Sequence, residues 1–207
     1  MTKKIYPDGN NLKFVDDVQT TPVTLEELTK GSQGAHSSRH EYGGADALDF
    51  SRSATLVVAA NDSEAKSKAT ADYVCDGTAD DVQIQAAIDG LPATYGGKVV
   101  LMEGIYNINA TINLTTGLIL EGQSQMGTRL MLKNDCNLMY ANTKNLVTVQ
   151  NMALYGDKEN YNGKGIYLYK CVGIQLRNLR IRQFSSFGID ICGDVTTKIT
   201  TVYLDDI

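Results

Sequence analysis

The stretch Val147-Thr-Val-Gln-Asn-Met-Ala-Leu154 returns later in the chain as Ile174-Gln-Leu-Arg-Asn-Leu-Arg-Ile181. Apolar residues take the first, third, sixth and eighth positions of both copies, and asparagine takes the fifth. Apolar and polar side chains that alternate in this way are typical of a β-strand with one buried face. The sequence therefore predicts a strand that is built twice, with its apolar positions in phase.

A second repeat lies beside the first. Gly165-Ile-Tyr-Leu-Tyr169 matches Gly188-Ile-Asp-Ile-Cys192, which defines a slightly shorter shift along the chain. Applied to the longer repeat, this shorter shift places Leu176 on Ile199. It also predicts two rows of side chains that point to solvent, Thr148–Arg177–Thr200 and Tyr155–Arg182–Asp205.

A repeat of about 25 residues that holds only short strands is too long for hairpins and too short for βαβ units. It fits one coil of a parallel β-solenoid, in which each coil adds one strand to each of several parallel sheets. We expect Asn151 and Asn178 at a corner between two strands, because asparagine tolerates the left-handed backbone and bonds to its own copies.

Upstream of the repeats, strands alternate with helices. We predict strands at 55–60 and 71–75, a short helix at 63–69 and an amphipathic helix at 79–90. The apolar face of the longer helix comprises Ile84, Ala87, Ile88 and Leu91. A helix with such a face must pack against another element.

We therefore expect a mainly β chain in three parts. These are a short irregular attachment or oligomerisation segment at 1–54, an α/β cap at 55–97, and the first coils of the solenoid at 98–207. The final strand, Val202-Tyr-Leu-Asp-Asp-Ile207, stops in mid-coil without a capping helix. We expect the solenoid to be incomplete, continued by further chain or capped by other subunits.

Composition excludes several classes of protein. The 207 residues carry 19 basic and 24 acidic side chains, a net charge of −5, so we expect no binding of nucleic acid. The apolar runs fall short of the roughly 20 residues that a membrane-spanning helix needs, and no cleavable signal is visible. Four cysteines without a C-x-x-C pair indicate free thiols and no zinc or redox cofactor.

Three stretches follow one another in the middle of the chain: Cys75-Asp-Gly-Thr-Ala-Asp-Asp-Val-Gln-Ile-Gln-Ala-Ala-Ile88, Gly96-Gly-Lys-Val-Val-Leu-Met-Glu-Gly-Ile-Tyr-Asn-Ile108 and Leu118-Ile-Leu-Glu-Gly122. Together they resemble the opening of the pectate-lyase superfamily of right-handed parallel β-helices. Met102-Glu103 stands where that family usually has a proline before the glycine. The resemblance covers most of residues 55–207 and implies that helix 79–90 caps the N-terminal end of the solenoid.

A shorter stretch, Ala35-His-Ser-Ser-Arg-His-Glu-Tyr-Gly-Gly-Ala-Asp-Ala-Leu48, is similar to a motif found upstream of such domains in bacteriophage tail proteins and some microbial surface proteins. The resemblance implies a virion tailspike or tail fibre, usually a homotrimer, held to tail or baseplate proteins through residues 1–54. The attachment residues predicted on this basis are His36, Arg39, His40 and Tyr42. Two histidines four apart would suit a metal on a helix, but this glycine-rich setting is not helical, so we predict packing against a partner chain and no metal.

Aromatic and arginine side chains make up the predicted carbohydrate-binding surface. Arg177, Arg180 and Arg182 project from one coil, and Tyr167 and Tyr169 project from another strand. Aromatic rings and bidentate cations suit an acidic polysaccharide laid along the coils. The alternative is a solvated face on which Arg182 merely pairs with Asp205.

Cleavage of a glycosidic bond would need two carboxylates about 5 to 9.5 Å apart. The candidates on the late strands are Asp190, Asp194 and Asp205. A further acidic group, Asp76, Asp80 and Asp81, begins the predicted helix, where we expect it to cap free N–H groups. No catalytic residue of the family matches this chain, so the sequence leaves open whether it is an enzyme.

The leading hypothesis is a phage tailspike or fibre that docks on the tail and binds, or also degrades, host surface polysaccharide. Two alternatives stay open. One is a secreted polysaccharide lyase or hydrolase, against which the absence of a visible signal counts, and the other is a non-catalytic adhesin on a microbial surface.

Overall fold

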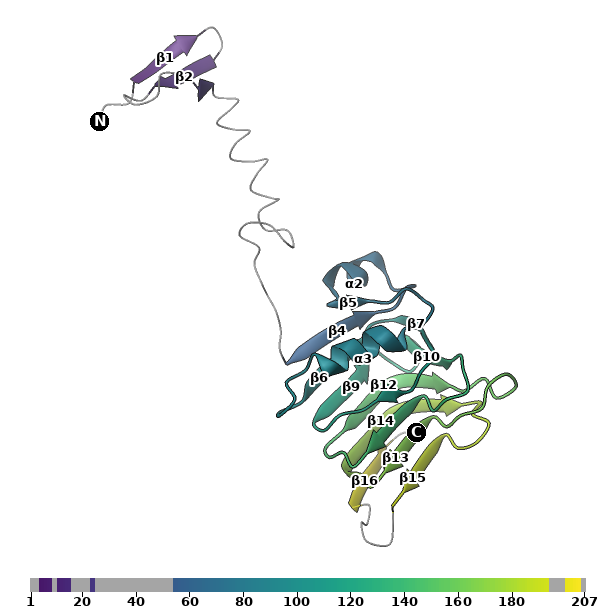
Figure 1. Cartoon of the computed structure of the whole chain (residues 1–207). Helices are drawn as coiled ribbons and strands as arrows, with labels where there is room; N and C mark the ends of the chain where they lie inside the picture. Colours follow the sequence, from purple (N-terminus) through teal and green to yellow (C-terminus); the bar gives the residue numbers. More distant parts are fainter. Residues whose placement is uncertain (1–3, 9–10, 16–22, 25–53, 194–199, 206–207) are drawn as a thin grey trace. The chain divides into compact units, whose positions relative to one another are not determined.

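A computed structural model describes residues 4–8, 11–15, 23–24, 54–193 and 200–205 (Figure 1). The chain divides into two compact units, Met1–Ser51 and Arg52–Ile207. The first unit contains an antiparallel sheet in the order β1 (Lys4–Asp8), β2 (Asn11–Val15), β3 (Val23–Thr24). The sequence predicted only an irregular segment here, because strands this short show too few alternations to be recognised.

The second unit is built from parallel strands that form three outer faces (Figure 1). The first face comprises β4 (Thr55–Ala59), β6 (Gly97–Leu101), β9 (Leu118–Gly122), the first half of β12 (Thr148–Tyr155), the first half of β14 (Val172–Arg182) and β16 (Thr200–Asp205), with β5 (Tyr73–Val74) at its edge. The second face comprises β7 (Gly104–Ile108), β10 (Thr128–Leu132) and the second halves of β12 and β14. The third face comprises β8 (Ile112–Asn113), β11 (Met139–Asn142), β13 (Ile166–Tyr169) and β15 (Ile189–Cys192).

The chain visits the three faces in turn. One coil consists of β6, β7 and β8, and the next consists of β9, β10 and β11. In the two coils that follow, one long strand, β12 or β14, spans the first and second faces, and β13 or β15 lies on the third. All strand pairs described between residues 54 and 205 are parallel. The predicted parallel β-solenoid is confirmed.

The strand register confirms both sequence repeats on the strands in which they were identified. Val149 pairs with Leu176, as the longer shift requires. Ile166 pairs with Ile189, as the shorter shift requires. Each shift therefore describes one face of the solenoid.

Carrying the shorter shift from the third face to the first was wrong. Leu176 pairs with Leu204 and not with Ile199, and Arg177 pairs with Asp205. Two residues, 170–171, connect β13 to β14, but seven, 193–199, connect β15 to β16. Because loops differ in length from coil to coil, a shift measured on one face does not hold on another.

The predicted outward rows change accordingly. The described rows of the first face are Thr148–Gln175–Tyr203 and Gln150–Arg177–Asp205, in place of Thr148–Arg177–Thr200. Tyr155 does pair with Arg182, as predicted, but Arg182 has no register partner in β16. The alternative in which Arg182 pairs with Asp205 is therefore wrong.

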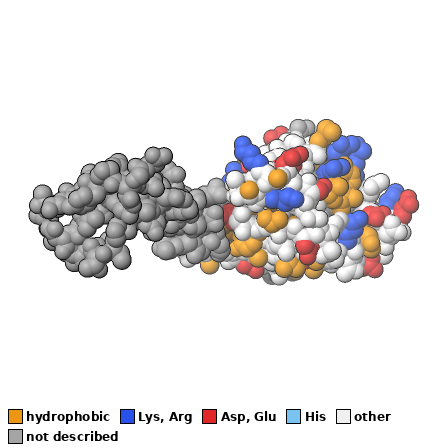
Figure 2. All heavy atoms as spheres, turned by 90° about the horizontal axis from the view of Figure 1, so that it is seen from above, with side chains coloured by type: hydrophobic (Ala, Val, Ile, Leu, Met, Phe, Trp, Pro, Cys, Tyr) orange, Lys and Arg blue, Asp and Glu red, His pale blue; other side chains and the backbone are white. Residues whose placement is uncertain are grey.

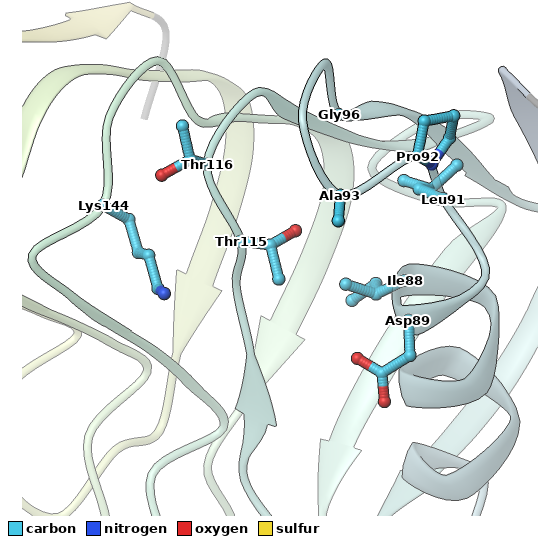
Figure 3. A pocket seen from close by; sticks show the side chains of 9 residues that line it. All are labelled: Ile88, Asp89, Leu91, Pro92, Ala93, Gly96, Thr115, Thr116 and Lys144. Atoms are coloured by element: carbon cyan, nitrogen blue, oxygen red, sulfur yellow. The ribbon is translucent and has the colours of Figure 1, made fainter.

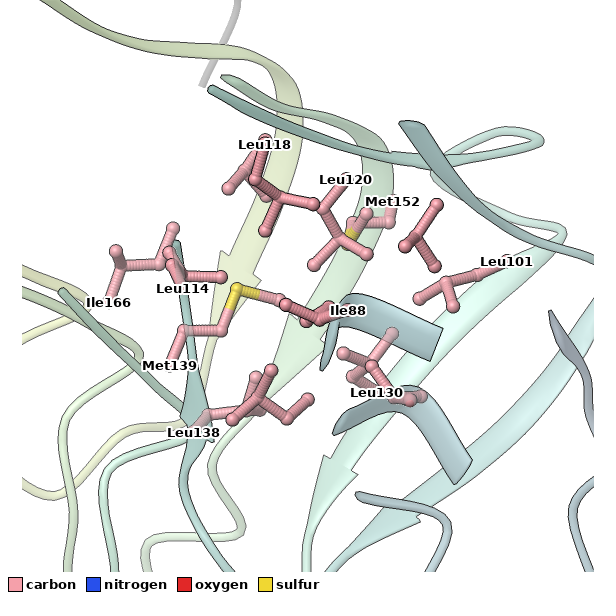
Figure 4. Close-up of a cluster of buried hydrophobic side chains, with 14 of the residues drawn as sticks. Ile88, Leu101, Leu114, Leu118, Leu120, Leu130, Leu138, Met139, Met152 and Ile166 are labelled. Carbon is pink, nitrogen blue, oxygen red and sulfur yellow. The ribbon is translucent and has the colours of Figure 1, made fainter. Parts of the chain in front are cut away.

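Inward side chains fill the solenoid in columns. One column of register partners runs Leu56, Val99, Leu120, Val149 and Leu176. Its members from Val99 to Leu176 are completely buried. Figure 4 shows side chains from all three faces, such as Leu120, Leu130 and Met139, converging on one core. Burial of these columns is what holds successive coils together.

The N-terminal end of the core is covered by α3 (Asp81–Asp89), which follows the short α2 (Ala65–Thr70). Ile84 and Ile88 of α3 are buried, and the helix contacts β4, β5, β7 and β8, so the predicted capping helix is confirmed. No helix in the described part of the chain is long and apolar enough to span a membrane.

Two acidic residues at the start of α3 attach the cap to the first coil. Asp80 accepts the N–H of Asn107 in β7 at 2.8 Å, and Asp81 accepts that of Asn109 at 2.8 Å. The predicted capping is wrong for α3 itself, which has no side-chain cap. The carboxylates do accept free backbone N–H groups just before the helix, since Asp76 accepts that of Thr78 and Asp80 accepts that of Gly77, both at 2.8 Å. Asp80 is fully buried, and this desolvation raises its pKa.

A ladder of polar side chains marks the corner between the first and second faces. Asn151 and Asn178 have positive φ angles of 60° and 47°, inside β12 and β14 respectively. The Asn178 amide donates to the Asn151 side-chain oxygen at 2.9 Å, and Asn151 donates to Glu121 at 3.0 Å. The predicted asparagine corner is confirmed, and it explains how one strand serves two faces.

All four cysteines are free thiols, as predicted. Cys75 and Cys171 are buried, whereas Cys136 and Cys192 are partly exposed.

Core columns predict where truncation destabilises the solenoid. Leu120→Ala leaves a cavity at a completely buried position and should lower the free energy of unfolding by about 2–5 kcal/mol. Ile119→Ala, the neighbouring outward position at 38% exposure, should cost less than about 1 kcal/mol. Urea unfolding of both variants measures the difference, and equal losses would contradict the inward placement of Leu120.

The corner predicts an unusual ranking at Asn151. Asn151→Gly removes the ladder bonds but keeps access to positive φ, whereas Asn151→Ala loses both. The alanine variant should therefore be less stable than the glycine variant by about 1 kcal/mol, the reverse of the order expected inside an ordinary strand. Urea unfolding decides, and a more stable alanine variant would rule out the left-handed corner.

Candidate functional site

The structure distributes the predicted carbohydrate-binding residues over three faces. Arg177 lies on the first face, and Arg180 and Arg182 lie on the second, because β14 turns at Asn178. Tyr167 and Tyr169 lie on the third face, in β13. The structure brings together Arg180 with Arg182, and Tyr167 with Tyr169, as the sequence suggested, but it separates the tyrosines and Arg177 from the other two arginines.

The tyrosines of the third face are stacked within the protein. Tyr140 of β11 pairs in register with Tyr167, and their ring centroids are 5.2 Å apart at an interplanar angle of 25°. On the following coil Tyr167 pairs with Asp190. The ammonium group of Lys164 lies 4.1 Å from the centre of the Tyr167 ring and 2.5 Å from Asp190 Oδ2. The Tyr167 ring is therefore already engaged within the protein, by Tyr140 of the preceding coil and by Lys164.

Asp190 is held as a carboxylate. The hydrogen bond from Lys164 is the main cause that lowers the pKa of Asp190, followed by the bond from Cys192, whose thiol donates at 3.1 Å. A general acid in glycoside hydrolysis needs a raised pKa. Asp190 is therefore an ion-pair partner of Lys164.

Of the other two candidate carboxylates, the structure describes Asp205, which lies on a different face from Asp190. Asp205 is exposed on the first face, next to Arg177 in register, whereas Asp190 belongs to the third face. Asp194 lies outside the described residues, as do the predicted attachment residues His36, Arg39, His40 and Tyr42. No group of three metal-ligating side chains occurs among the residues that the structure describes.

The second face carries an arginine that the sequence analysis missed. Arg129 of β10 pairs with Ala153 of β12, and Ala153 pairs with Arg180 of β14. A parallel row joins Met131, Tyr155 and Arg182. Arg129 could have been found by testing the shift along the chain that links it to Ala153, but no sequence similarity marks that shift.

Among residues 54–193 and 200–205, none of the three arginines of this face forms an ion pair with an acidic side chain. The ion pairs that the structure shows in these ranges are Lys98–Glu121 and Lys164–Asp190. Arg129 and Arg182 are exposed, and Arg180 is half-buried. The second face is therefore the strongest candidate site for an anionic ligand.

A hollow of about 350 Å³ lies elsewhere, at the corner between the third and first faces. Figure 3 shows Ile88, Asp89 and Leu91 on one side of it and Lys144 on the opposite side. No aromatic or guanidinium group lines it. On the face of the second unit that Figure 2 shows, acidic and basic side chains are scattered, without one large patch of either sign.

The comparisons with known proteins support the fold. No family model matches the sequence, and no curated protein matches it either. A solved structure described as "Geobacillus virus E2 - ORF18" is similar, with a TM-score of 0.52 and 16% identity over 88% of this chain. The match covers 35% of that viral protein, so the chain spans about a third of its length. At this level of identity the likeness supports the fold, the parallel β-solenoid, over most of the chain.

The Lys164–Asp190 pair predicts that the stability of the fold decreases both at low pH and at high pH. Asp190 stabilises the fold above its ordinary pKa of 3.8, and this contribution is lost as the pH falls through the lower folded value. The pKa of Lys164 is raised, mainly by its bond to Asp190, so its contribution is lost only above the ordinary 10.5.

Carbon-13 NMR titration of the Asp190 carboxyl tests the pair directly. The native protein should titrate below pH 3.8, and Lys164→Met should move the pKa of Asp190 upward. An unchanged pKa in Lys164→Met would show that Lys164 does not hold Asp190.

Proposed function

We propose that the chain is part of a phage tailspike or tail fibre whose β-solenoid binds host cell-surface polysaccharide. The observation that carries the proposal is the parallel β-solenoid shared with a viral protein over most of this chain. Each coil repeats the same outward positions about 4.8 Å further along the axis. Such a surface offers regularly spaced contacts to a linear polymer of repeated sugar units.

The same proposal places residues 1–54 at the phage tail and the protein in the virion. The division of the chain into two compact units, Met1–Ser51 and Arg52–Ile207, supports this proposal. We further propose a homotrimer, in which the solenoids would stand together on one tail. Degradation of the bound polysaccharide is not part of the proposal, because the candidate carboxylates that the structure describes, Asp190 and Asp205, lie on different faces.

Location and binding test the proposal together. Antibody raised against residues 1–54 should label the tails of purified virions in immunogold electron microscopy, and the purified full chain should bind polysaccharide extracted from the host surface. Label confined to the cell envelope would instead indicate an adhesin. Release of reducing ends by a protein found only in the medium would indicate a secreted enzyme.

A further inference from the structure

The geometry of the second face points to a ligand class: we propose that it binds the carboxylates of an acidic polysaccharide through Arg129, Arg180 and Arg182. This inference rests on the proposed function and names the kind of sugar that the solenoid recognises. A polymer of uronic acid units carries the required carboxylate on each unit.

The register sets the spacing of the arginines. Arg129 and Arg180 stand on either side of Ala153, two strand spacings apart, which separates their Cα atoms by about 10 Å. Arg180 and Arg182 are two residues apart on β14, about 7 Å along the strand. Ala153, the residue between the first two, has only a methyl group as its side chain, and this group is completely buried.

The second face differs from the other two in the charge of its outward side chains. Its outward positions on β7, β10, β12 and β14 are Ile105, Asn107, Arg129, Met131, Ala153, Tyr155, Arg180 and Arg182. None of them is acidic. On the first face, by contrast, Lys98 is paired with Glu121, and Arg177 has Asp205 beside it in register. On the third face Lys164 is neutralised by Asp190.

The chemistry of the side chains favours carboxylates. Guanidinium is planar and presents two parallel N–H groups to the two oxygens of one carboxylate, and it remains charged at all physiological pH values. Arg180 is half-buried, and partial removal from water strengthens a charged hydrogen bond. Tyr155 adjoins Arg182 across the strands and offers apolar surface and a hydroxyl group to a sugar ring.

Binding of the full chain to polygalacturonate, measured by isothermal titration calorimetry, tests the inference, with neutral dextran as the comparison polymer. We expect polygalacturonate to bind and dextran not to bind, with weaker binding at higher salt. Arg129→Gln/Arg180→Gln should reduce the affinity about tenfold or more. The control is Arg177→Gln, on the other side of the Asn178 corner, which should leave the affinity within about twofold.

Two further measurements sharpen the result. Arg180→Lys keeps the charge but loses the planar fork, so it should also weaken binding, and full affinity in this variant would overturn the bidentate contact. Equal binding of dextran sulfate would overturn the preference for carboxylates. An equal loss in Arg177→Gln would overturn the placement on the second face.

Failure of the inference is distinguishable from failure of the proposed function. If extracted host polysaccharide binds with the same affinity to the native chain and to Arg129→Gln/Arg180→Gln, the arginine site is wrong while polysaccharide binding stands. If no host polysaccharide binds, the proposed function fails and the inference fails with it.

Discussion

Each coil of the solenoid is joined to the next by parallel backbone hydrogen bonds, so every inward residue is followed, one coil later, by another inward residue. The column from Val99 to Leu176 shows the consequence, since each of its members is completely buried. A polar side chain in such a column would lose its hydration without gaining a partner. The core columns therefore fix the register, and the register in turn fixes which side chains stand next to one another outside.

The corner between the first and second faces depends on the same stacking. Asn151 and Asn178 adopt a backbone conformation that most residues avoid, and their side chains bond to each other across the coils. This turn inside a continuous strand sends Arg177 to one face and Arg180 to the next. The difference matters for the proposed ligand, because the first face has acidic side chains beside Lys98 and Arg177, whereas the outward strand positions of the second face have none.

Sequence patterns predicted the fold correctly where they reflected the packing of neighbouring strands or of the helix. The alternation around Asn151 and Asn178 gave the correct register on β12 and β14, and the apolar face of helix 79–90 gave the cap. The pattern failed at β16, where a connection of seven residues replaces one of two. Loop length leaves no trace in strand periodicity, so only the structure shows that Leu204 follows Leu176.

The candidate site was harder to predict, because it depends on neighbours that are remote in sequence. Arg180 and Arg182 were singled out from their spacing, but Arg129 joins them only through Ala153. Likewise, the tyrosines of the third face look suited to sugar stacking until Tyr140 and Lys164 are placed against Tyr167. An outward side chain can be predicted from alternation, but whether it is free or already engaged cannot.

Disulfide trapping across neighbouring coils is a direct test of whether the coils stack in register. With Cys136 and Cys192 replaced by alanine, the pair Gln150→Cys/Arg177→Cys occupies register partners on the first face, at the Cα separation of about 5 Å that a disulfide accepts. The pair Thr148→Cys/Arg177→Cys is diagonal, about 8 Å apart, and should not close. The in-register stack predicts rapid oxidation of the first pair alone, and preferential closure of the diagonal pair would show that the two coils are shifted by two residues.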